Sequence, residues 1–135
     1  MRLGEGDFRT YVAAFNTGDF DTVGGYYDDA IVLENAAGVR MVGRDAIFAF
    51  YRKVRQDTHR MLTVRRVFTH PDGLAAELQS EFVALRDAPD FASGPLRAGD
   101  RILVETVAVY DLTPDGARFA RIRSGRLART FIPAA

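Results

Sequence analysis

The fold of this chain is decided largely within residues 10–35, which read TYVAAFNTGDFDTVGGYYDDAIVLEN. Apolar side chains at positions 8, 11, 12 and 15 follow a 3.6-residue repeat, which predicts a helix from about Glu5 to Asn16. Gly18 suits the left-handed residue that ends a helix. Asp19 suits the N-cap of a second helix, whose inner face would carry Phe20, Val23 and Tyr27.

The same stretch ends in a short predicted strand, Ala30 to Asn35. The helix before it carries Tyr11 on its apolar stripe. A phenol and a carboxamide, Tyr11 and Asn35, would therefore face one cavity from opposite walls. Gly24 and Gly25 lie in the second helix, where close packing of helices explains two missing side chains best.

Downstream of this stretch the apolar period changes from 3.6 to 2. A third helix is predicted from about Arg44 to Gln56, with a polar link before it. The strands expected after it are Arg60–Thr69, Leu74–Leu85, Asp100–Leu112 and about Arg118–Ser124. The remaining residues are expected to trail over the surface toward Phe131, and Arg86 to Gly99 is expected to form a long loop.

Strand periodicity assigns faces to individual side chains. In the second long strand Ser80 shares the inward face with Leu78 and Phe82. In the third, Thr106 and Ala108 point inward and Glu105 points to the back. In the last strand the parity stays open between two pairs, Arg121 with Arg123 or Ile122 with Ser124.

Three helices followed by hairpin-linked strands indicate a single α+β domain over residues 1–135. We expect a cystatin-like α+β cone, in which a curved antiparallel sheet carries the three N-terminal helices on its concave face and encloses a pocket. Such a pocket is the usual place for a small-molecule site.

Composition excludes several classes of function. Eighteen acids balance eighteen bases, so no overall charge draws the chain to nucleic acid. No apolar run is long enough to span a membrane, and no apolar segment resembles a signal peptide. The absence of cysteine excludes disulfides and thiolate chemistry, and favours a cytoplasmic protein. No spacing of His59 or His70 with acids predicts a metal site, and no cofactor motif occurs.

Three segments resemble a known family: YVAAFNTGDFDTV, YYDDAIVLEN and VGRDAIFAFY. They are similar to the nuclear-transport-factor-2-like superfamily, in particular the group of ketosteroid isomerases and SnoaL-like polyketide cyclases. The resemblance is detailed over about residues 5–55 and follows only the general pattern beyond them. It implies the cone fold, but not one activity, because the superfamily holds both enzymes and non-enzymatic domains.

In a ketosteroid isomerase, an aspartate base moves a proton while a tyrosine and a protonated aspartic acid donate hydrogen bonds to the enolate. The resemblance places the tyrosine at Tyr11, the base at Asn35 and the protonated acid at Ala108. A carboxamide cannot accept and return a proton near neutral pH, so the usual isomerase mechanism is not expected.

The sequence thus predicts a domain that binds a small hydrophobic molecule, such as a polyketide-, terpenoid- or steroid-like metabolite. Tyr11 and Asn35 are the candidate catalytic residues for an isomerase, cyclase or lyase activity. The expected pocket residues are Phe15, Tyr27, Leu33, Phe50, Tyr51, Leu78, Ser80, Phe82, Thr106 and Ala108. The alternative is a non-catalytic carrier or accessory dimerisation module. The apolar back of the Asp100–Leu112 strand predicts a homodimer in either case.

Overall fold

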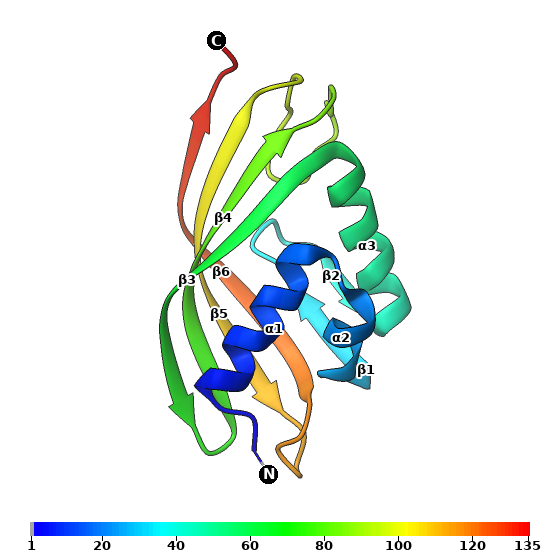
Figure 1. Ribbon diagram of the computed structural model, residues 1–135, viewed down its shortest axis with the longest axis vertical. Helices are drawn as coiled ribbons and strands as arrows, with labels where there is room; N and C mark the ends of the chain where they lie inside the picture. The colour runs from blue at the N-terminus through cyan, green and yellow to red at the C-terminus, as the bar shows by residue number, and fades with distance from the viewer. Residues whose placement is uncertain (1) are drawn as a thin grey trace.

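Three helices pack on one face of a bent six-stranded sheet in the computed structural model, which describes residues 2–135 (Figure 1). The helices are α1 (Glu5–Thr17), α2 (Phe20–Gly25) and α3 (Arg44–Asp57). The strands are β1 (Tyr27–Glu34), β2 (Arg40–Val42), β3 (Thr58–His70), β4 (Gly73–Ala84), β5 (Arg101–Leu112) and β6 (Phe119–Ile132). The predicted α+β cone is confirmed.

The strands follow the order β2-β1-β6-β5-β4-β3. Every neighbouring pair is antiparallel except β1 and β6, which run parallel. The sheet is therefore mixed, and the expectation of a purely antiparallel sheet is corrected. Figure 1 shows α1, α2 and α3 on the concave side, where a register shift in β3 between Val64 and Arg66 accompanies the bend.

The predicted local signals between the first two helices are confirmed. Gly18 adopts a φ of 74°, a left-handed conformation that side chains rarely tolerate. Asp19 caps α2 by accepting a hydrogen bond from the Thr22 amide at 3.2 Å. A Cβ on Gly24 would lie 3.2 Å from the Phe48 ring, so this glycine permits the close approach of α2 and α3.

Two element boundaries differ from expectation at the first strand. Tyr27 begins β1 and does not belong to α2, which ends at Gly25. The strand therefore starts three residues before Ala30, because the main chain of Tyr26 and Tyr27 already pairs with Phe119 of β6. The link after β1 also contains a short strand, β2, which pairs back onto β1.

The last strand is longer than expected. β6 continues past Ser124 to Ile132 and pairs with β5 as far as Arg101. Its apolar alternation is lost near Gly125, where the register shifts opposite Glu105 and Thr106, so the periodicity that marks a strand disappears although the pairing persists. The expectation that these residues trail over the surface is wrong.

The open parity of β6 is now resolved. Ile122 is buried and points inward with Ser124. Arg121 and Arg123 face outward, where they pair with Glu34 at 2.7 Å and with Asp111 at 3.4 Å. Another cross-strand ion pair, Arg66 with Glu77, lies at 2.6 Å, as the hairpin register predicts.

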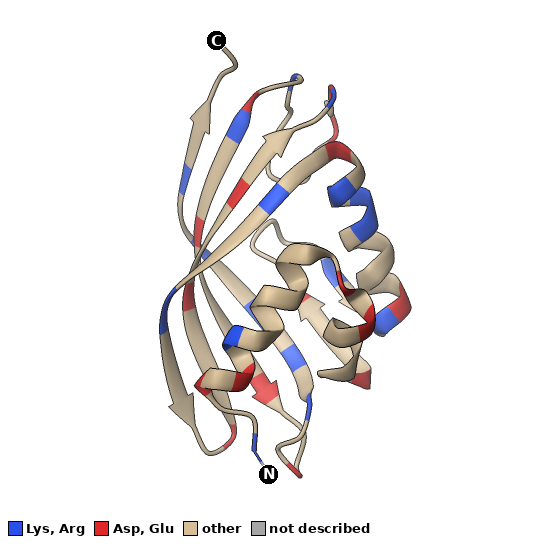
Figure 2. Cartoon of the chain, in the orientation of Figure 1, with Lys and Arg blue, Asp and Glu red and all other residues tan. Residues whose placement is uncertain are grey.

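Charged side chains of both signs are scattered over the helices and strands in the view of Figure 2. The back face of β5 carries Leu103, Val107 and Val109 together with Glu105. All four side chains are partly exposed. A homodimer through this face stays a prediction. None of the helices in the described part of the chain is long and apolar enough to cross a membrane.

Asp57, the last residue of α3, is a buried carboxylate held between two cations. Lys53 Nζ lies 2.9 Å from one of its oxygens, and Arg86 Nε donates to the other at 2.8 Å. These hydrogen bonds hold the pKa of Asp57 below its usual range. Because Arg86 opens the long loop before β5, this cluster ties the loop to the end of α3.

Replacing Asp57 by asparagine should lower the free energy of unfolding at pH 7 by about 1–2 kcal/mol, a modest value because both cations are half exposed. The folded-state pKa is depressed, so the contribution is present above the unfolded value of about 4 and is lost as the pH falls through the folded value. Urea unfolding of both proteins at pH 7 and pH 3 measures this. An equal difference at the two pH values would contradict the role of the charge.

Candidate functional site

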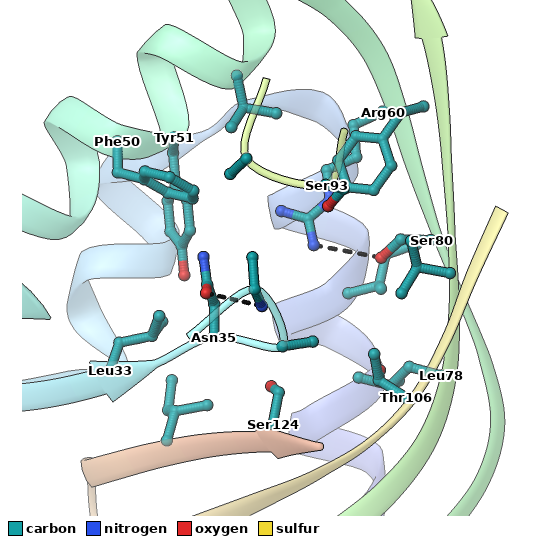
Figure 3. A pocket seen from close by; sticks show the side chains of 18 of the residues that line it. Leu33, Asn35, Phe50, Tyr51, Arg60, Leu78, Ser80, Ser93, Thr106 and Ser124 are labelled. Atoms are coloured by element: carbon teal, nitrogen blue, oxygen red, sulfur yellow. Dashed lines mark hydrogen bonds between the residues drawn. The ribbon is translucent and has the colours of Figure 1, made fainter. Parts of the chain in front are cut away.

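A cavity of about 110 Å³ lies between the helices and the concave face of the sheet. Most of its wall is apolar, and a few polar side chains reach it from separate elements (Figure 3). The lining residues are Tyr11, Phe15, Leu33, Asn35, Ala36, Ala37, Phe50, Tyr51, Val54, Arg60, Leu62, Leu78, Ser80, Phe82, Phe91, Ala92, Ser93, Val104, Thr106, Tyr110, Ile122 and Ser124. Its concave shape and mostly apolar wall are typical of a small-molecule site, and its volume lies below the ~300–1,000 Å³ that is usual for drug-sized ligands.

Ten of the twelve side chains that the sequence singles out lie on this wall. They are Tyr11, Phe15, Leu33, Asn35, Phe50, Tyr51, Leu78, Ser80, Phe82 and Thr106. Tyr27 and Ala108 lie outside it and are corrected here. The Tyr27 ring is fully buried, and Ala108 is too short to reach the space that its neighbours on β5, Thr106 and Tyr110, line.

Tyr27 is connected to the cavity through a chain of hydroxyls. Its oxygen lies 2.6 Å from the hydroxyl of Tyr11 and 2.9 Å from that of Tyr51, and both partners line the cavity. Burial raises the pKa of all three phenols above the usual value, so they are neutral donors near pH 7.

Three hydroxyls supply three protons, and two of them are used within this chain. If both outer phenols donated to Tyr27, its own proton would be left unpaired in the core, which is costly. A chain that runs in one direction avoids that cost and leaves its third proton on Tyr11 or Tyr51. The tyrosine chain therefore presents one hydrogen-bond donor to the cavity.

Replacing Tyr27 by phenylalanine should lower the free energy of unfolding by about 1–3 kcal/mol, because it leaves two buried hydroxyls without their shared partner. Tyr110→Phe is the matched control, because Tyr110 also lines the cavity but does not belong to the hydrogen-bonded chain of Tyr11, Tyr27 and Tyr51. Chemical unfolding followed by circular dichroism compares the two. A cost no larger for Tyr27 than for Tyr110 would contradict the role of the chain.

Asn35 closes β1 and turns its side chain into the following loop. Its Oδ1 accepts hydrogen bonds from the amides of Ala37 and Val39, each at 3.0 Å. These two donors fix which end of the amide is oxygen. Figure 3 shows the nitrogen end in the space beneath Tyr51. Asn35 thus holds its own turn and offers amide protons to the cavity.

Arg60 is the charged lining residue, and the sequence did not predict it as part of the pocket. It lies near the start of β3, and its guanidinium carbon is 4.9 Å from the ring centres of both Phe15 and Phe82. Its Nη2 donates to Ser80 Oγ at 3.2 Å (Figure 3), and its Nε is buried without a partner. The signal was available, because Arg60 shares strand parity with the buried Leu62.

The long loop before β5 covers one side of the cavity. Phe91, Ala92 and Ser93 line the space, and the Phe91 ring contacts the Phe82 ring at a centroid distance of 5.2 Å. The loop is also held from β6, where Arg129 Nε donates to the Ser93 carbonyl at 2.6 Å. The loop is therefore anchored at its tip as well as at the Asp57 cluster.

The wall of this cavity carries one cation and no carboxylate, imidazole, thiol or lysine among the described residues. Glu34 points outward to Arg121, which holds its pKa below the usual range. Within residues 2–135 no cluster of metal-ligating side chains is present. His59 and His70 are exposed, and neither lines the cavity. The side chains present can donate hydrogen bonds and hold an anion, but none is an ordinary base.

The fold and the cavity define a cone-shaped α+β domain that encloses a small-molecule-sized cavity. A model of the SnoaL-like domain matches residues 8–129, and the chain belongs to this family. No curated protein sequence matches it.

Solved structures share the fold at low sequence identity. A candidate polyketide cyclase from Pseudomonas putida KT2440 superposes with a TM-score of 0.74 at 21% identity, covering 87% of this chain and 86% of its own. A second candidate polyketide cyclase, from Xanthomonas campestris pv. campestris, gives 0.73 at 19% identity and coverages of 87% and 85%. A computationally designed 17-OHP binder gives 0.69 at 18% identity, with 91% of each chain covered.

Proposed function

We propose that this protein binds a small, largely apolar molecule that carries one or two oxygen atoms. The observation that carries the proposal is the convergence of hydrogen-bond donors on one mostly apolar cavity. The tyrosine chain and the Asn35 amide come from the helix side and the end of β1, and Arg60 with Ser80 comes from the sheet. An apolar wall supplies affinity, and a few placed donors supply orientation.

The donors suit carbonyl, hydroxyl or carboxyl oxygens on the ligand. Two of the structural relatives are described as candidate polyketide cyclases, and a third was designed to bind 17-OHP. These relatives support a polyketide-, terpenoid- or steroid-like metabolite as the ligand class. The proposal for this chain rests on its own cavity, because relatives of such low identity share only the fold.

The proposed role is binding and orientation, with hydrogen-bond donation to a ligand oxygen by Tyr11 or Tyr51. An isomerase, cyclase or lyase activity in this cavity would need a tyrosine hydroxyl or a bound water to carry the proton, because the lining offers no carboxylate base. Asn35 stands where the resemblance places that base. We therefore do not propose steroid isomerisation.

Titration with the neutral fluorescent dye N-phenyl-1-naphthylamine tests the proposal. We expect one dye per chain, and Ser124→Phe should weaken binding at least about tenfold by filling the cavity from β6. Leu127→Phe is the matched control, because Leu127 lies on the same strand and is 66% exposed. Circular dichroism checks that both variants stay folded, and native mass spectrometry of the purified protein looks for a retained ligand.

Equal dye binding by the wild type and Ser124→Phe would place the site elsewhere. Absence of dye binding by the wild type would favour the alternative, a non-catalytic dimerisation module that acts through the back face of β5. The two proposals are thus separated by one titration together with the oligomeric state from sedimentation velocity.

A further inference from the structure

The Arg60 guanidinium is a cation in the cavity wall without an anion. Among residues 2–135 no carboxylate forms an ion pair with it, and burial lowers the pKa of the Arg60 guanidinium. Of its five N–H donors, one meets Ser80, and the Nε donor is buried with no partner. Arg60 is half-buried as a residue, but its Nε is enclosed without a partner, which is uncommon for a charged group.

The two aromatic faces only partly replace a counter-ion. Phe15 and Phe82 both lie 4.9 Å from the guanidinium carbon, a distance at which each ring attracts the cation. That attraction is weaker than the penalty for removing a guanidinium from water. The rings therefore hold Arg60 in position but do not neutralise its positive charge. The missing element is an anion on the cavity side.

We infer that the ligand bound in this cavity is a carboxylic acid in its ionised form, with its carboxylate on Arg60 and Ser80 and its apolar part along the remaining wall. The inference rests on the proposed function and deepens it by naming the ligand class. The guanidinium fork matches the two oxygens of a carboxylate, and the Ser80 hydroxyl extends the same cluster.

The rest of the cavity agrees with an anionic ligand. Its described lining holds no acidic side chain that would repel a carboxylate, and the polar groups near it, the Asn35 amide and the tyrosine chain, are donors. A cation as ligand would meet the positive charge of Arg60 and find no carboxylate. The charge in the wall thus discriminates between ligands of similar shape.

A matched pair of ligands tests the inference: cinnamate and its neutral isostere cinnamamide, each used to displace N-phenyl-1-naphthylamine at pH 7. The wild type should bind cinnamate at least about tenfold more tightly than cinnamamide. Arg60→Met should remove this preference in protein that circular dichroism shows to be folded. Arg60→Lys should retain part of it, because the lysine keeps the charge and loses the fork. The exposed Arg126→Met serves as the control and should behave as the wild type.

Equal binding of the two compounds by the wild type would overturn the inference, as would a carboxylate preference that survives in Arg60→Met. Displacement by neither compound while the dye still binds would overturn it too, and would leave the proposed function standing. Failure of the wild type to bind the dye would instead remove the proposed function and the inference together. The comparison of cinnamate with cinnamamide in the wild type tests the inference even where a variant does not fold.

Discussion

Arg60→Met should raise the free energy of unfolding by about 1–3 kcal/mol in the absence of ligand, because it removes a buried donor that has no partner. Most substitutions in a protein interior destabilise, so the sign of this one is informative. The wild type keeps a guanidinium in the cavity wall with no carboxylate beside it and an unpartnered Nε. Methionine removes that uncompensated charge and keeps a flexible apolar chain between Phe15 and Phe82.

Urea unfolding at pH 7, monitored by circular dichroism, measures this change. Arg126→Met on the exposed face of β6 is the control and should change stability by less than about 0.5 kcal/mol. A loss of stability in Arg60→Met would show that the guanidinium packs favourably as it stands and needs no anion. A gain of stability in Arg60→Met would show that the arginine lowers the stability of the wild type, which is typical of residues in binding sites.

Asn35→Asp should weaken the binding of cinnamate about 30-fold. The substitution sets a negative charge on the wall of the cavity that Arg60 also lines. At an effective dielectric constant of about 20, like charges repel by about 2 kcal/mol if their separation is about 8 Å, which is the separation assumed for this expected effect. The new carboxylate stays ionised near neutral pH, because the amides of Ala37 and Val39 already donate to this position. The binding of neutral cinnamamide should change by less than about twofold.

The control for this variant adds the same charge outside the cavity. Gln56→Glu lies on the exposed face near the end of α3 and should leave both affinities unchanged. An equal loss of affinity for cinnamate and cinnamamide in Asn35→Asp would indicate that the turn is disturbed, and not that like charges repel. An unchanged affinity for cinnamate would show that Asn35 does not share a cavity with the bound carboxylate.

Local chemistry made the first half of the fold predictable. Periodicity placed the first and third helices within one residue of their observed ends, and Gly18 and Asp19 marked the junction of α1 and α2. The parallel pairing of β1 with β6 was not predictable in this way, because it joins segments from opposite ends of the chain. The second half of β6 was missed because its pairing persists where its apolar alternation does not.

Strand parity and the apolar stripes of the helices predicted part of the cavity wall. They placed Ser80 and Thr106 on the wall, and they failed for Ala108, since facing inward does not ensure a side chain long enough to reach the space. Arg60 was missed because a charged residue at a strand end ordinarily points to solvent. Strand parity with Leu62 places Arg60 on the inner face, but its position between two phenylalanine rings depends on α1 packing across β3.

The parallel pair of β1 and β6 also determines when the binding site can exist. Leu33 on β1 and Ile122 on β6 are direct partners in the sheet, and both line the cavity. Synthesis proceeds from the N-terminus, so the ribosome has produced the helices and most strands before it adds this part of the floor. A nascent chain that ends before β6 therefore has no complete cavity, and ligand can be captured only after β6 has been made.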